Sequence, residues 1–272
     1  MQALYDFIAG TLNTVAWIYI LLPCVFVGGL YYTIGSGGVQ FRRFGYAMKN
    51  TFGKIFKKTD AGEGEVTPLQ AVCTALAGTV GTGNIVGTSQ AIALGGYGAI
   101  FWLWLAALLG MVIKYAEVTL SIRYREKDTK GDWVGGPMYY IKNGLGQKWA
   151  WLAILFCTFA VLASFGIGNM SQANSINDSI KGAIAAFAPD FANVAAVDWV
   201  IGIALALLTA GVLFGGIKRI GSVTERLVPI MSIVYIIFTL VVIFGNIDMV
   251  GEAFRKIFIA AFNPQAVVGA GS

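Results

Sequence analysis

The chain of 272 residues is 57% hydrophobic and 12% charged, whereas about 25% of an ordinary soluble domain is charged. Its mean hydropathy of +0.72 indicates several membrane-spanning segments. The net charge of +5 does not indicate nucleic-acid binding, because the basic residues lie in short loops between apolar runs. With no histidine, no phosphate-binding loop and no Cys-x-x-Cys pair, the sequence carries no enzyme signature and predicts no cofactor.

Uncharged runs long enough to cross a bilayer recur along the chain, since about 20 apolar residues suffice. In chain order the predicted spans are 15–34, 66–94, 99–122, 149–176, 199–217 and 227–247. Residues 123–148, 181–198 and 218–226 are predicted to be polar loops. We therefore expect an all-helical polytopic protein of the cell membrane.

Basic and aromatic residues mix in the segment 40–58, where Arg42 and Arg43 lie beside Phe41 and Phe44. Such a pattern is typical of an amphipathic segment on the membrane surface. A plain solvated loop is the alternative for its central part. The composition alone leaves both interpretations open.

The positive charges predict the orientation of the chain. The segments 35–65, 123–148 and 218–226 hold 6, 6 and 3 of the 19 Lys and Arg residues, and the opposite loops hold Lys181, Arg255 and Lys256. Loops rich in Lys and Arg face the cytoplasm. The N-terminus is therefore expected outside.

The second predicted span contains an interruption rich in glycine, at positions 78, 81, 83 and 87. Glycine holds a helix poorly, and irregular backbone at membrane depth is tolerated only inside protein or beside a cavity. The freed amides would suit an anion and the freed carbonyls a cation. Close helix packing through small residues is the alternative, but the four polar residues interspersed here favour a binding site.

The fourth predicted span is unusually polar in its second half, where Asn169 and Gln172 are three residues apart. Amides buried in lipid need partners, so these two could hold a substrate amino group or line its path. Ile176, one turn beyond, could close a small apolar pocket. Hydrogen bonding between helices without any ligand is the competing interpretation.

Lys114 and Glu117 lie within the third predicted span at a spacing that allows them to pair along one helix. Such a pair lowers the cost of burying two charges in the membrane. A structural pair near the cytoplasmic end is the preferred interpretation. A hydrogen bond to the interrupted helix, or a proton relay, is the alternative for Glu117.

Three motifs together resemble the alanine or glycine:cation symporter family, whose members are also called sodium:alanine symporters. They are Ala77-Gly78-Thr79-Val80-Gly81-Thr82-Gly83-Asn84-Ile85, the segment 91–102 and Gly135-Gly136-Pro137-Met138-Tyr139-Tyr140. The resemblance runs from about Thr67 onwards. It implies a LeuT-type fold of two inverted five-helix repeats, of which this chain would hold an extra helix and basic segment (1–65), the first repeat (66–247) and a connector (248–272).

The same resemblance implies roles for residues of the interruption. The carbonyls of Ala77 and Val80 match positions that bind sodium in LeuT-type carriers, and Thr79 and Asn84 match a second, optional ion position. The backbone amides of the next three residues match those that hold a substrate carboxylate. Those residues are Gly81, Thr82 and Gly83.

The function implied is sodium-coupled import of a small neutral amino acid, alanine or glycine, by alternating access. A proton-coupled or other-solute carrier of the same fold is one alternative, and a channel or a non-transporting membrane subunit is another. The expected partners are the amino acid, Na⁺ as coupling ion, the lipid bilayer and a second repeat. Because that repeat is absent from these residues, we expect the chain to be the N-terminal portion of a longer protein.

Overall fold

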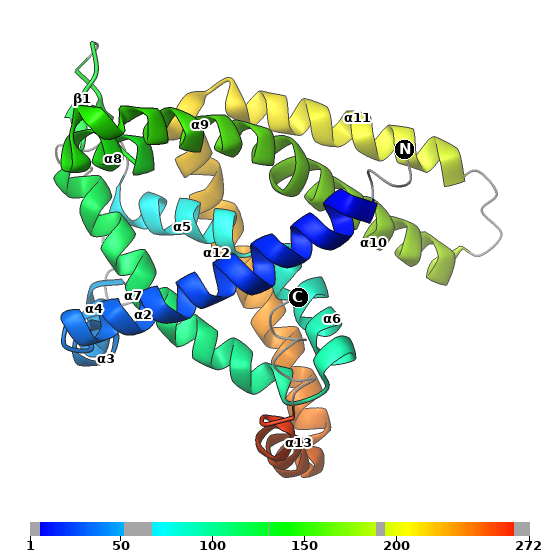
Figure 1. Ribbon diagram of the computed structural model, residues 1–272. Coiled ribbons are helices and arrows are strands. Elements are labelled where there is room, and N and C mark those ends of the chain that lie inside the picture. Colours follow the sequence, from blue (N-terminus) through cyan, green and yellow to red (C-terminus); the bar gives the residue numbers. More distant parts are fainter. Residues whose placement is uncertain (1–5, 52–66, 130, 189–193, 264–272) are drawn as a thin grey trace. The chain divides into compact units, whose positions relative to one another are not determined.

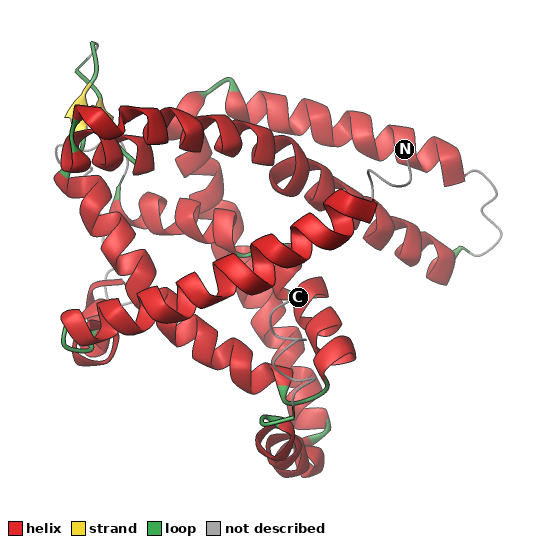
Figure 2. Ribbon diagram, in the orientation of Figure 1, coloured by secondary structure: helices red, strands yellow, loops and turns green. Residues whose placement is uncertain are grey.

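The computed structural model describes residues 6–51, 67–129, 131–188 and 194–263, and these are almost entirely helical (Figures 1 and 2). The chain divides into two compact units, which are described separately. The first comprises Met1–Lys58, Gly83–Leu120 and Val234–Ser272, and the second comprises Thr59–Thr82 and Ser121–Ile233.

Within the described residues, five helical segments are long and apolar enough to cross a membrane, or six when one bent pair is counted as a single span. They are Gly10–Gly35, Ala99–Arg123, Gln147–Phe187, Ala196–Leu213 and Gly216–Gly245, with Leu69–Thr79 and Thr82–Gly95 forming the bent pair. The predicted class, a helical multi-pass membrane protein, is thereby confirmed. Most large apolar side chains on these helices are exposed, as lipid contact requires.

The first unit is built from the N-terminal helices, the C-terminal part of the interrupted span, the helix that follows it and the C-terminal helix. Its elements are η1 (Asp6–Leu12), η2 (Val15–Leu21), α2 (Leu22–Gly35), α3 (Val39–Arg42), α4 (Phe44–Thr51), η4 (Thr82–Asn84), α6 (Val86–Gly95), α7 (Ala99–Arg123) and α13 (Ile247–Ala260). The dividing lines fall after Thr82 and after Leu120, so η4 and α7 cross them.

A tight turn joins α2 to α3, and it uses Gly37 and Gly38 at φ of 62° and 65°. Only glycine adopts this left-handed conformation without a steric cost. The basic segment predicted at 40–58 is helical as far as it is described, in α3 and α4. Its residues Lys54, Lys57 and Lys58 lie outside the described part of the chain.

Aromatic side chains fasten α13 to the start of α7. Phe101 packs against Phe258 with ring centroids 5.8 Å apart, and Trp104 lies 6.1 Å from Phe254. The indole nitrogen of Trp102 donates a hydrogen bond to the carbonyl of Ala261. The segment 248–272, expected to be a connector, therefore begins with an amphipathic helix that packs against α7.

The second unit holds the remaining helices and a small hairpin. Its elements are α5 (Pro68–Thr79), β1 (Glu126–Lys127), β2 (Trp133–Val134), α8 (Pro137–Leu145), η5 (Gln147–Trp149), α9 (Ala150–Phe165), η6 (Gly166–Met170), α10 (Ser171–Phe187), α11 (Val194–Leu213) and α12 (Gly216–Gly245), the last of which continues into the first unit beyond Ile233.

Three segments predicted as loops contain regular structure. Residues 123–148 form an antiparallel hairpin, with Glu126 opposite Val134, followed by helix α8. Across this hairpin, the guanidinium of Arg125 lies over the Trp133 ring, 3.9 Å from its centroid. The predicted loop 218–226 is the beginning of α12. Charged residues mark where a span leaves the apolar layer, but they do not end a helix.

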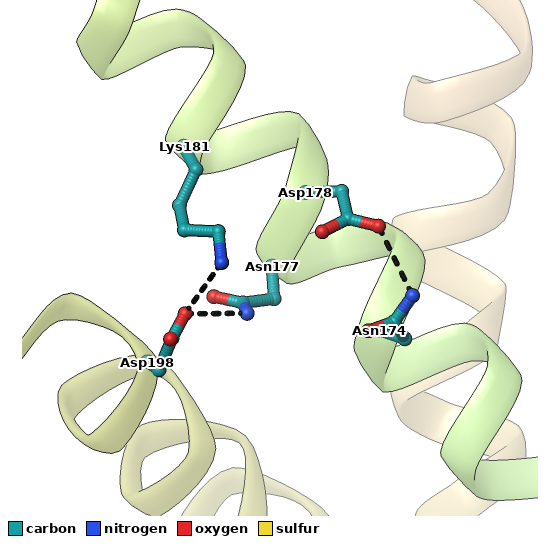
Figure 3. A network of polar contacts seen from close by, with 5 residues as sticks. All are labelled: Asn174, Asn177, Asp178, Lys181 and Asp198. Atoms are coloured by element: carbon teal, nitrogen blue, oxygen red, sulfur yellow. Dashed lines mark hydrogen bonds and ion pairs between the residues drawn. The ribbon is translucent and has the colours of Figure 1, made fainter. Parts of the chain in front are cut away.

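The predicted loop 181–198 was wrong at both of its ends, because α10 continues to Phe187 and α11 already begins at Val194. Polar contacts link these two helices (Figure 3). Asp198 accepts hydrogen bonds from the Asn177 amide at 2.7 Å and from the Lys181 ammonium at 2.9 Å. These partners allow charged residues to stay helical at the end of a span.

Gly98 leaves no room for a side chain where α7 meets α13. A Cβ atom added there would lie against the carbonyl of Ala260 and 2.8 Å from the amide nitrogen of Ala261. We predict that Gly98→Ala destabilises the protein by about 1–3 kcal/mol, as overpacking does. Thermal unfolding of the purified full-length protein measures this loss.

Gly110→Ala is the matched control, because a Cβ at Gly110 on the same helix meets no heavy atom within 4 Å. Its unfolding midpoint should equal or exceed that of the wild type, since alanine favours a helix. Equal stability of the two variants would contradict the packing described for α7 and α13.

Candidate functional site

The interruption predicted in the second span is present. Helix α5 ends at Thr79, Val80 is extended with φ of −85° and ψ of 97°, and η4 occupies a single short turn before α6 begins. The helical segments on the two sides are bent by 65°. Each side is described within its own unit, because the dividing line falls after Thr82.

The N-terminal side of the break is the end of α5. The amide of Val80 still bonds to the carbonyl of Leu76 at 2.7 Å, and the hydroxyl of Thr79 donates to the carbonyl of Ala75 at 2.8 Å. The helix stops there, and the last carbonyls of a helix lack partners within it. Ala77 belongs to that last turn, and its role as a carbonyl ligand stays a prediction.

Gln172 is the side chain that reaches the break. Its Oε1 atom accepts a hydrogen bond from the backbone amide of Thr82, with 3.4 Å between nitrogen and oxygen. Its Nε2 atom lies 3.1 Å from the place that a Cβ on Gly81 would occupy. The contact is long, so it is a weak hydrogen bond to an amide that the interruption has freed. Of the residues predicted as substrate ligands, the structure therefore brings Gly81, Thr82 and Gln172 together.

Asn169 and Ile176 belong to the same helical run as Gln172, but their side chains are more exposed than that of Gln172. Asn169 lies in the widened turn η6, and its side chain is exposed. Ile176 is 40% exposed. No contact between either residue and the break is described. Their roles as an amino-group ligand and as a pocket wall stay predictions.

The C-terminal side of the break, from Gly83 onwards, belongs to the first unit. Gly83 and Asn84 are exposed within η4. The hydroxyl of Thr88 donates to the carbonyl of Asn84 at 3.0 Å, and the hydroxyl of Ser89 donates to the carbonyl of Ile85 at 2.8 Å. These two hydroxyls satisfy carbonyls of their own helix. The first backbone amides of α6 have no acceptor in a preceding turn of that helix, so this end carries partial positive charge.

The predicted pairing of Lys114 and Glu117 is confirmed within α7. The lysine Nζ atom lies 2.9 Å from a carboxylate oxygen, and both side chains are partly exposed. In the described residues, no group of His, Cys, Asp or Glu side chains is arranged to hold a metal ion.

A contact that the sequence did not predict lies near the start of α5. The Nε2 atom of Gln70 donates to a carboxylate oxygen of Glu225 in α12 at 3.0 Å, and the hydroxyls of Thr74 and Thr224 lie 3.1 Å apart. Because residues 218–226 were expected to be a loop, Glu225 received no role. The spacing of Gln70 and Thr74 on one helix face was the available signal.

A helical multi-pass membrane protein with an unwound, polar break inside one span belongs to the class of membrane transport proteins. Residues 1–272 match the family model for the sodium:alanine symporter family, and the chain belongs to that family. The resemblance in the sequence was expected to begin only near Thr67, but the match also includes the first helix. Its members are transporters and not enzymes.

Similar proteins support this assignment. An uncharacterized transporter of Haemophilus influenzae is 43% identical over 96% of this chain and 54% of its own length. The sodium/alanine symporter AgcS of Methanococcus maripaludis is 40% identical over 97% of this chain and 57% of its own. The probable sodium/glutamine symporter GlnT of Bacillus subtilis is 33% identical over 99% of this chain and 53% of its own. The chain spans about half the length of the curated relatives it matches.

The contact between Gln172 and the break can be tested through Gly81. In Gly81→Ala, the new methyl group would press on the Gln172 amide and displace it from the amide of Thr82. Because Gln172 is itself a predicted substrate ligand and would lose one contact to the substrate when displaced, we predict that the apparent affinity of the full-length protein for its amino acid falls about five- to tenfold. Equilibrium binding of the radiolabelled amino acid measures the change.

Gly78→Ala is the matched control, since a Cβ at Gly78 in the same interruption meets no heavy atom within 4 Å. It should bind the amino acid as the wild type does. An equal loss in both variants would indicate a general intolerance of side chains in this segment, with no particular role for Gln172.

Proposed function

We propose that the full-length protein imports a small neutral amino acid, alanine or glycine, together with Na⁺ by alternating access. The observation that carries this proposal is the hydrogen bond from the Thr82 amide to Gln172 at the break. It joins a freed backbone donor to a side chain that can both donate and accept. The proposal extends the family assignment to a particular substrate and ion.

The substrate carboxylate is proposed to bind the amides of Gly81, Thr82 and Gly83. Those amides stand at the start of the outer half-helix, where partial positive charge favours an anion. A carboxylate is a stronger acceptor than the Gln172 amide oxygen and would take its place on Thr82. Gln172 could then turn its Nε2 atom toward the substrate. Asn169 and Ile176 are proposed to complete the amino-group and side-chain contacts.

Sodium is proposed to bind the carbonyls at the end of α5. Ala77 and Val80 supply backbone oxygens, and Thr79 and Asn84 supply oxygens for a second, optional position. Carbonyl and hydroxyl oxygens are hard ligands that suit an alkali cation. The family description and the printed names of AgcS and GlnT both specify sodium, which supports this choice over protons.

The fold is proposed to be LeuT-type, with the N-terminal helix outside the core and residues 66–247 as the first of two inverted repeats. A second repeat would then supply the other half of the substrate and sodium ligands. The N-terminus is proposed to lie outside, because the segments rich in Lys and Arg would face the cytoplasm of a cell membrane. The carrier would work by rocking the first-repeat bundle against a scaffold.

A second candidate substrate is glutamine, which the printed name of the similar protein GlnT specifies. The same backbone amides would bind its carboxylate, so the interruption does not distinguish it from alanine. The size of the side-chain pocket near Ile176 would decide between them. A proton-coupled carrier, a channel and a non-transporting subunit are the remaining alternatives.

Uptake by the full-length protein in proteoliposomes tests the proposal. We predict that radiolabelled alanine accumulates with an inward sodium gradient and no proton gradient. A proton gradient in sodium-free buffer should give no accumulation, because the proposed ion ligands are carbonyl and hydroxyl oxygens. Uptake should also saturate, as expected for a carrier and not for a channel.

Uptake driven by protons alone would refute the sodium assignment. Glutamine is tested in parallel under the same gradients. Accumulation of glutamine without accumulation of alanine would move the assignment to the larger substrate, while leaving the carboxylate site in place.

A further inference from the structure

Helix α5, the inner half of the interrupted span, is joined to the first part of α12 by two hydrogen bonds between side chains, one helical turn apart. Gln70 donates to Glu225 at 3.0 Å, and one turn further along α5 the hydroxyls of Thr74 and Thr224 lie 3.1 Å apart. Both helical segments belong to the second unit and can be followed in Figure 1. We call these four residues the α5–α12 clamp.

Gln70 has a second task that fixes how its amide is used. It is part of a capping box at the start of α5. The side-chain Oε1 atom of Gln70 accepts a hydrogen bond from the backbone amide of Thr67 at 3.1 Å, and the backbone amide of Gln70 donates to the Thr67 hydroxyl at 3.2 Å. The oxygen is thereby occupied, so only the NH₂ group is left for Glu225. Glutamate at this position would also complete a capping box, but it would place a second carboxylate against Glu225.

Opening the clamp would leave few polar groups without partners. The hydroxyl of Thr224 already donates to the carbonyl of Ile220 at 2.9 Å within its own helix, so in the clamp Thr74 is the donor. On separation, Thr74 can bond to a carbonyl of its own preceding turn, as threonines in helices do. Glu225 is half-buried and would gain water. The clamp is therefore built from contacts that can be exchanged at low cost.

The position of the clamp relative to the break gives it a consequence for transport. At its other end, α5 stops at Thr79, and the extended residue Val80 follows. A helix that ends at an extended residue, and that is attached at its other end by side-chain contacts, can change direction when those contacts open. The attachment then decides whether the carbonyls at the end of α5 stay in place.

We propose that the α5–α12 clamp is a polar latch that holds the inner half of the broken helix in place, and that it must open for release toward the cytoplasm. Gln70 and Glu225 are its positioning residues. The transport step that the latch controls rests on the proposed function, whereas the latch itself rests only on contacts within the second unit. Its opening would expose the face of α5 that carries Gln70 and Thr74.

Cys73 provides a native reporter of this movement. It lies on that face of α5 between the two clamp levels and is only 3% exposed. The other cysteines of this chain, Cys24 and Cys157, are more exposed and are replaced by alanine in the test protein. The rate at which N-ethylmaleimide modifies Cys73, measured at a pH at which the exposed thiol is ionised in every variant, then measures how often α5 leaves α12.

The test exchanges donor and acceptor across the clamp in the full-length protein. Gln70→Glu keeps the capping box but opposes two carboxylates, so Cys73 should react about tenfold faster than in the wild type. Glu225→Gln leaves an amide pair that can still bond, so the rate should change little. The double variant Gln70→Glu/Glu225→Gln rebuilds the hydrogen bond in reverse and should return the rate to the wild-type value.

Ser222→Ala is the control, since Ser222 is exposed on α12 close to the clamp and should leave the rate unchanged. An unchanged rate in Gln70→Glu would overturn the proposal, and so would a fast rate in the double variant that matches Gln70→Glu alone. A misfolded single variant would be recognised by loss of the monodisperse elution peak, and rescue by the double variant would still support the pairing.

Alanine uptake by the same variants separates the latch from the proposed function. The maximal rate of uptake should fall in Gln70→Glu and recover in the double variant, with little change in KM. If the wild type transports no amino acid, the proposed function fails, while the Cys73 rates still decide whether the latch exists. Normal uptake in Gln70→Glu combined with a fast Cys73 reaction would overturn the role of the latch in transport.

Discussion

The whole arrangement depends on how a broken helix satisfies its backbone inside a membrane. Water is absent there, so each amide and carbonyl freed by the interruption after Thr79 needs another partner. The chain supplies some of these from nearby, through the Val80 amide and the hydroxyls of Thr79 and Thr88. The Thr82 amide instead takes a distant side chain, Gln172, over a long contact. A weakly held donor of this kind is what an incoming carboxylate can use.

Helix α5 is held by exchangeable polar contacts near both ends. At the break, Gln172 holds the residue that follows the joint, and near the other end Glu225 holds Gln70. Each contact is a single hydrogen bond that includes at least one side chain, and that side chain, Gln172 or Gln70, can form other hydrogen bonds. Interhelical hydrogen bonds in membranes are modest, at about 0.6 kcal/mol on average. Such contacts suit the movement of α5 that we propose.

The spans and the break were predictable from the sequence because lipid imposes strong rules on hydropathy and on backbone bonding. The ends of the helices were not, because Lys181 and Asp198 pair across two helices and let both extend beyond the apolar layer. Gln172 was found because a buried amide needs a partner. Glu225 was missed because residues 218–226 were expected to be a loop. The spacing of Gln70 and Thr74 indicates a polar face on α5, but it does not identify a partner that lies 155 positions away in the chain.

The most direct measurement of the central claim asks whether the break binds a carboxylate. Alaninamide keeps the amino group and the methyl group of alanine but lacks the carboxylate. Its competition against radiolabelled alanine for the full-length protein in sodium buffer isolates that group. We predict no displacement even at about a hundredfold excess, because a site built to bond a polar group rejects an analogue that lacks it. Displacement by alaninamide at the concentrations at which alanine itself competes would contradict the account.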